Sequence, residues 1–110
     1  MNPPKHVTIG PYRYELVVSA AEVAKANRND GELRLGLTDT RNLRILVCDD
    51  AADQVVQETC FHEVLHAAFA VSGLSEALGA EKEESVVAAL SPVLYGALRA
   101  NERLVSWLTS

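Results

Sequence analysis

The chain has 110 residues, of which 48% are hydrophobic and 23% are charged, and its formal net charge is −5 at pH 7. These values are typical of a globular domain with a modest core, so we predict a single domain over residues 1–110. The negative charge argues against a nucleic-acid-binding protein, which needs a basic face, and no apolar stretch is long enough to span a bilayer.

The N-terminal segment and the two cysteines indicate the compartment. Pro3 and Pro4 fall where a secretion signal would need its apolar core, so we expect no signal peptide and a cytoplasmic protein. Cys48 and Cys60 then stay reduced, and we interpret them as small buried hydrophobic residues rather than as a disulfide.

The first predicted elements are strands and a short helix. Residues 6–18 (HVTIGPYRYELVV) form either a strand pair with a turn in its middle or one kinked strand. Ser19 and Glu22 have the spacing of a capping box, which predicts a short helix that begins there and ends near Ala26. Residues 27–31 (NRNDG) are then predicted to form a turn.

An alternating apolar pattern follows. Leucines alternate with other residues over 33–37, and a second alternating run over 43–47 follows the polar turn 38–42 (TDTRN). Period two on both sides of a turn predicts an antiparallel β-hairpin that presents one face to the core. The residues on that face would be Leu33, Leu35, Leu37, Leu43, Ile45 and Val47.

A long helix is predicted over residues 51–72. Asp49 or Asp50 would cap its N-terminus, and Gly73 supplies a left-handed stop. Its side chains are apolar on most sides, so we expect it to be buried all round. Together with the hairpin and a C-terminal helix, this predicts an α+β fold in which a small antiparallel sheet packs on a buried helix.

The rest of the chain is predicted to be a loop and a last helix. Residues 75–80 form a loop or a single turn, and the last helix begins near Glu81. Pro92 cannot donate a hydrogen bond to the residue four positions earlier. The helix therefore either kinks or restarts there, with Ser91 as the cap of the restarted helix.

Residues 61–71 (FHEVLHAAFAV) place His62, Glu63 and His66 on the apolar helix. Two imidazoles four residues apart can each direct one nitrogen at a single metal ion, and the glutamate between them can take a proton from water. This pattern serves metal-assisted hydrolysis of peptide bonds. The alternative is a pair of core histidines that bond to backbone carbonyls, but Glu63 beside them would also need a partner.

A catalytic zinc ion needs a third protein ligand. The acidic residues Glu81, Glu83 and Glu84 begin the last helix, and the chain that joins them to His66 is long enough to fold back over the site. The apolar side of this helix is aligned with Glu83, so helical spacing favours Glu83 as the ligand, with Glu84 as the alternative. Each of the three is also explained as a solvated acid at a helix N-terminus.

Residues 61–69 (FHEVLHAAF) and 83–104 (EESVVAALSPVLYGALRANERL) resemble a known group of proteins. These are the small phage- and prophage-encoded metallopeptidases of the zincin group, single-domain relatives of the ImmA/IrrE-like and SprT-like peptidases. The resemblance extends more weakly to the hairpin 36–47 (GLTDTRNLRILV) and covers residues 31 to 105. Its specific motif is the His-Glu-x-x-His helix.

The resemblance implies a minimal zincin-like fold and a zinc-dependent peptidase in the cytoplasm of a host bacterium. It implies His62 and His66 as Zn²⁺ ligands, Glu63 as general base, and Glu83 or Glu84 as the acidic ligand. It also implies that the edge strand of the sheet accepts an extended polypeptide substrate by strand addition.

Two other interpretations stay open at the level of sequence. One is a catalytically inactive, zinc-stabilised module that binds or regulates a protein partner, and the other is a phage accessory protein that oligomerises through its last helix. No side chain is clearly indicated as an oxyanion stabiliser; Tyr95 is a candidate by residue type, but its position in the middle of a helix favours a packing role.

Overall fold

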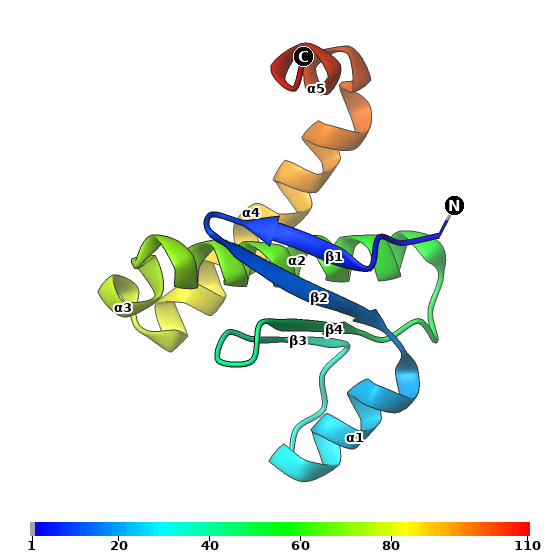
Figure 1. Ribbon diagram of the computed structural model, residues 1–110, viewed down its shortest axis with the longest axis vertical. Helices are drawn as coiled ribbons and strands as arrows, with labels where there is room; N and C mark the ends of the chain where they lie inside the picture. The colour runs from blue at the N-terminus through cyan, green and yellow to red at the C-terminus, as the bar shows by residue number, and fades with distance from the viewer. Residues whose placement is uncertain (1) are drawn as a thin grey trace.

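The computed structural model describes residues 2–110 and consists of a four-stranded sheet and five helices (Figure 1). In chain order the elements are β1 (His6–Ile9), β2 (Tyr12–Val18), α1 (Ala20–Asp30), β3 (Gly36–Asp39), β4 (Arg44–Val47), α2 (Asp53–Ser72), α3 (Leu74–Leu78), α4 (Ala80–Ala100) and α5 (Glu102–Leu108). The predicted α+β class is confirmed.

The sheet is mixed, so the predicted antiparallel sheet is wrong. The strand order is β1-β2-β4-β3, and β2 runs parallel to β4, whereas the other two neighbouring pairs are antiparallel. The parallel pair arises because α1 and β3 lie between β2 and β4 in the chain and carry it back across the sheet.

The first two strands form an antiparallel hairpin, so of the two predicted alternatives the strand pair is correct and the single kinked strand is not. Its turn contains Gly10, whose φ of +56° lies in the left-handed region that favours glycine. A Cβ atom on Gly10 would lie 2.8 Å from Cγ1 of Val71 on α2. The turn therefore fits closely against the end of that helix.

Helix α1 begins as predicted and ends later than predicted. The Ser19 side chain accepts a hydrogen bond from the backbone N–H of Glu22 at 3.2 Å, which confirms the cap. The helix continues through residues 27–30, so the predicted end near Ala26 is wrong. It ends where Gly31 adopts the left-handed conformation at no steric cost.

The β3–β4 hairpin is confirmed, but its first strand begins later than the alternating pattern indicates. Leu33 is 99% exposed and Leu35 is 52% exposed, and both precede β3. Leu37 pairs with Leu46, and the side chains of Leu46 and its neighbour Ile45 point to opposite faces of β4. Because paired residues point to the same face, Leu37 and Ile45 lie on opposite faces, and the predicted single apolar face is wrong.

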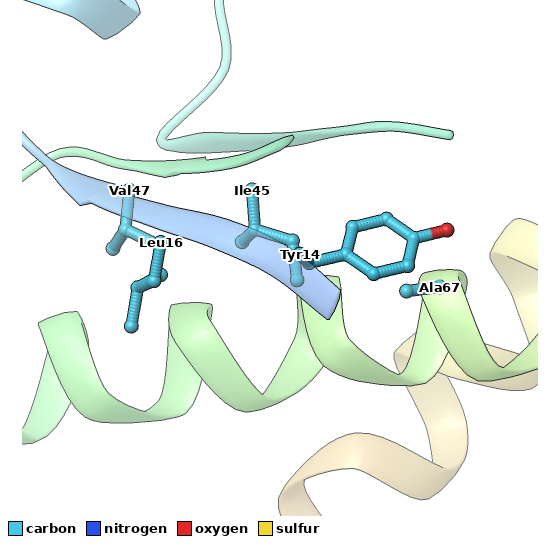
Figure 2. Close-up of a cluster of buried hydrophobic side chains, with 5 residues drawn as sticks. All are labelled: Tyr14, Leu16, Ile45, Val47 and Ala67. Atoms are coloured by element: carbon cyan, nitrogen blue, oxygen red, sulfur yellow. The ribbon is translucent and has the colours of Figure 1, made fainter. Parts of the chain in front are cut away.

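Helices cover both faces of the sheet, which explains why both faces of the hairpin are apolar. α1 contacts β4 on one face, where Val23 and Leu46 are buried. α2 lies along the other face and is not buried all round as predicted, since Val55 is 41% exposed. The core between the sheet and α2 consists of Tyr14, Leu16, Ile45, Val47 and Ala67 (Figure 2).

Helix α2 ends at a left-handed Gly73, as predicted. Its N-cap is Ala52, which makes no side-chain cap, so the predicted cap at Asp49 or Asp50 is wrong. Asp49 instead accepts a hydrogen bond at 2.8 Å from the backbone N–H of Ala20, the first residue of α1. A side chain expected to serve one helix thus stabilises the start of another.

Pro92 lies inside the continuous helix α4, so of the two predicted outcomes, a kink or a restart capped by Ser91, the restart is wrong. The proline removes the hydrogen bond that the carbonyl of Ala88 would accept. Both Ala88 and Pro92 are exposed, so water can satisfy this carbonyl and the helix continues. Beyond the proline, the second half of α4 and α5 extend away from the sheet (Figure 1).

The predicted absence of a disulfide is confirmed. Cys48 and Cys60 are free thiols, and both are partly buried. Burial raises the pKa of the Cys60 thiol, and the nearby Glu63 carboxylate adds to this effect. Within residues 2–110, no helix has both the length and the apolar character that crossing a membrane requires.

The β3–β4 turn should make stability depend on pH. Asp39 accepts hydrogen bonds from the side chain and the backbone N–H of Asn42, and the side-chain bond is the main reason why the pKa of Asp39 lies below its ordinary value. A carboxyl whose pKa is lower in the folded state contributes stability above its unfolded pKa of about 3.9, and this contribution is lost as the pH falls.

Asn42→Ala should therefore lower the melting temperature by about 2–5 °C at pH 7, and its difference from wild type should shrink below about pH 4. Thermal unfolding followed by circular dichroism at pH 7 and pH 3 measures this, with the exposed Thr40→Ala in the same turn as control. A difference that is as large at pH 3 as at pH 7 would contradict the role of Asp39.

Candidate metal centre

A groove of about 940 Å³ lies between β3, α2 and the first turn of α4. It brings together all five residues that the sequence indicates for the site, although they come from two helices separated by α3. Gly79 precedes α4 with a φ of +82°, a conformation that glycine adopts without strain as the chain turns back toward α2. The residues are His62, Glu63, His66, Glu83 and Glu84.

His62 and His66 lie on successive turns of α2 and face this groove. Their ring centroids are 4.9 Å apart in an edge-to-face arrangement, and their side chains are mostly buried. The Glu84 carboxylate reaches both rings: Oε1 lies 3.3 Å from His62 Nε2, and Oε2 lies 2.8 Å from His66 Nε2. The two Nε2 atoms thus converge on one carboxylate.

The partners of His66 differ from those of an ordinary core histidine. Its Nδ1 atom contacts the Glu83 carboxylate, and its Nε2 atom contacts the Glu84 carboxylate. The alternative in which backbone carbonyls satisfy the imidazole nitrogens therefore does not describe this residue.

His62, His66 and Glu84 can hold a metal ion, because one ligand atom from each lies within 4.8 Å of the others. Two ligand atoms that share a tetrahedral zinc ion at about 2.0–2.1 Å lie roughly 3.3 Å apart. Oε1 of Glu84 lies at that spacing from His62 Nε2, at 3.3 Å, and Oε2 lies closer to His66 Nε2, at 2.8 Å. The donor set therefore fits zinc, although imidazole nitrogens also suit copper, nickel and iron.

Glu83 has a different position from Glu84. Its Oε2 atom lies 2.5 Å from His66 Nδ1, and its side chain is 13% exposed, compared with 60% for Glu84. A carboxylate on the second nitrogen of a ligand histidine fixes the orientation of the ring and leaves Nε2 free for the ion. Helical spacing favours Glu83 as the third ligand, whereas the structure brings Glu84 into the ligand group and places Glu83 behind His66.

Glu63 lies between the two histidines in sequence and is 7% exposed. Its Oε1 atom lies 2.9 Å from the Thr38 hydroxyl, within hydrogen-bonding distance. Burial raises the pKa of Glu63, while the hydrogen bond from Thr38 and the imidazoles of His62 and His66 oppose this rise. Glu63 is not one of the three residues of the ligand group.

Two residues on β3 contact Glu63 and were not identified from the sequence. Thr38 bonds to its carboxylate, and Gly36 approaches its Cγ atom. In the sequence, Gly36 is one of the residues that alternate with the leucines, and Thr38 opens the predicted turn. The alternating pattern shows which residues can face a helix, but it does not show which helix they meet.

Tyr95 lies away from the groove, as its predicted packing role requires. Its hydroxyl donates a hydrogen bond to Gln57 at 2.8 Å, and its ring centroid lies 6.2 Å from that of Phe61. It is not one of the residues that line the groove. Its role in the structure is to join α4 to α2.

No family model, curated protein or solved structure matches this chain.

Substitution of Glu84 tests the ligand group. Glu84→Ala removes a ligand oxygen and its charge, so zinc affinity should fall by more than about a hundredfold. Glu81→Ala is the matched control, because Glu81 lies in the same helical turn, is exposed and lies outside the ligand group. Titration calorimetry with zinc at pH 7 measures both variants, and equal affinities would show that Glu84 is not a ligand.

Glu83→Ala should have a smaller effect than Glu84→Ala. Loss of a carboxylate that orients a ligand histidine typically lowers metal affinity about tenfold to a hundredfold, because the ring is no longer held. The same calorimetric titration provides the measurement. If Glu83→Ala lowered the affinity more than Glu84→Ala does, Glu83 would be the ligand and the assignment of the two residues would be reversed.

Proposed function

We propose that this protein is a zinc-dependent metallopeptidase of the small phage- or prophage-encoded type, with a minimal zincin-like fold. The observation that supports this most strongly is the position of the buried Glu63 beside His62, His66 and Glu84, which can hold a cation. A metal-ligand group next to a carboxylate that is not a ligand is the arrangement that metal-assisted peptide hydrolysis uses.

Each group has a defined role in the proposed reaction. Zinc, when held by His62, His66 and Glu84, supplies Lewis-acid chemistry that lowers the pKa of water and polarises a carbonyl oxygen. Glu63 accepts a proton from the attacking water as the water oxygen bonds to the substrate carbonyl carbon. Glu63 then gives this proton to the amide nitrogen as the carbon–nitrogen bond breaks, which yields a carboxylic acid and an amine.

The groove suits an extended polypeptide as the substrate. β3 is the last strand of the sheet, so one edge of its backbone has no partner strand within residues 2–110. Residues 36–38 of this strand also line the groove. A polypeptide that pairs with this edge by strand addition would lie along the site. The proposed substrate is therefore an extended polypeptide, and the proposed phage or prophage origin implies that it lies in the bacterial cytoplasm.

A second candidate is a catalytically inactive module that uses zinc to stabilise its fold and the free edge of β3 to bind a protein partner. The position of Tyr95 favours this candidate, because its hydroxyl bonds to Gln57 and does not line the groove where an oxyanion would need a donor. Stoichiometric zinc without peptide cleavage would identify this module.

Glu63→Gln separates the two candidates. The amide cannot accept a proton, so cleavage of a peptide library should fall about 10²- to 10⁴-fold, while zinc content stays at the wild-type level. Mass spectrometry of the library and elemental analysis of the same samples measure both quantities. Glu76→Gln is the control, since Glu76 is exposed on α3 and lies outside the groove lining.

Cleavage by Glu63→Gln at the wild-type rate would show that Glu63 is not the base. Absence of cleavage by the zinc-loaded wild-type protein would instead favour the binding module.

A further inference from the structure

Strand β3 lies very close to α2 at Gly36. This residue is buried, and a Cβ atom added to it would lie 3.0 Å from Glu63 Cγ, from Thr59 Cγ2 and from the carbonyl oxygen of Leu46. A methyl group there would be in unusually tight contact, so the Glu63 and Thr59 side chains and the Leu46 carbonyl would have to move by a few tenths of an ångström. The φ of Gly36 is not positive, so the close approach, and not an unusual backbone conformation, is what favours glycine here.

Thr38 lies two residues further along β3 and faces the same side of the strand. Its Oγ1 atom lies 2.9 Å from Oε1 of Glu63 and 2.8 Å from the backbone carbonyl oxygen of Glu63. The hydroxyl has one proton, which it shares between these two acceptors. Thr38 therefore ties both the side chain and the backbone of Glu63 to the strand.

The two contacts hold Glu63 at two points along its side chain. Gly36 lies against the Cγ methylene group, and Thr38 bonds to the carboxylate. A glutamate side chain has three rotatable bonds, and without such contacts it populates several rotamers. Restricting it at both points favours the single orientation in which the carboxylate is directed toward the groove.

We propose that Gly36 and Thr38 are positioning residues for Glu63, and that they couple the position of the base to the register of the edge strand β3. The catalytic consequence of this positioning rests on the proposed peptidase function. If β3 shifted by one residue, Leu37 and Asp39 would face the helix in place of Gly36 and Thr38. A bulky side chain and a second carboxylate would then lie beside Glu63. The strand that would pair with the substrate is therefore also the strand that fixes the base.

The first test compares Thr38→Val, which keeps the shape of the side chain without the hydroxyl, with Thr38→Ser, which keeps the hydroxyl. Carbon-13 labelling of the glutamate carboxyl groups gives an NMR signal for Glu63, identified by its loss in Glu63→Gln. At pH 7, with and without zinc, this signal should shift or broaden in Thr38→Val and keep its wild-type position in Thr38→Ser. An unchanged signal in Thr38→Val would overturn the proposal.

Turnover of a cleaved peptide gives the second readout. In Thr38→Val, kcat should fall about tenfold to a hundredfold at unchanged KM and zinc content, and Thr38→Ser should restore it to within about threefold of wild type. A rise in KM at unchanged kcat would overturn the proposal, because Thr38 would then support only the strand. If the wild-type protein cleaves no peptide, the peptidase function fails, and the NMR signal alone decides the positioning of Glu63.

Gly36→Ala tests the other contact, with Gly96→Ala as the matched control. A Cβ atom at Gly96 would meet nothing within 4 Å, whereas one at Gly36 meets Glu63. Gly36→Ala should move the Glu63 signal, and Gly96→Ala should leave both the signal and turnover unchanged. Identical Glu63 signals in the two variants would overturn the role of Gly36. Thr38→Val adds no bulk and decides the proposal if Gly36→Ala does not fold.

Discussion

The contact between α2 and the first turn of α4 gathers two imidazoles and three carboxylates, and the site depends on how these charges are balanced. Glu63 and Glu83 are largely buried, and Glu84 lies over both His62 and His66. Carboxylates brought together away from water raise the free energy of the folded state unless positive charge compensates them. A divalent cation held by both Nε2 atoms and Glu84, as we propose, would provide this compensation where the two helices meet.

The rest of the fold keeps α2 and α4 in the positions that this contact requires. The sheet holds α2 through a core on one face, in which Ala67 of the helix packs near Tyr14 and Ile45 (Figure 2). The short α3 and the left-handed Gly79 then bring the start of α4 back over α2. From the other side, β3 approaches Glu63 closely because Gly36 has no side chain. The proposed base thus lies where the strand and the two helices meet.

Several features that depend on near neighbours in the sequence could be predicted, whereas the individual partners of side chains on distant elements could not. The Ser19 cap and the Gly73 stop follow from residues within one helical turn. Asp49 bonds to a residue 29 positions away, which no local pattern indicates. Helical spacing identified Glu83 as the inward acid, but this residue contacts the far nitrogen of His66, and only the more exposed Glu84 reaches both Nε2 atoms.

The central claim is that one divalent cation binds between α2 and α4. The most direct measurement is a crystal structure of the protein grown with zinc, with diffraction data collected on both sides of the zinc absorption edge. We predict one anomalous peak about 2.0–2.2 Å from His62 Nε2, His66 Nε2 and an oxygen of Glu84, with Glu63 nearby but not a ligand. The absence of a peak there, or a peak bound instead by Glu83 and His66 Nδ1, would contradict the claim.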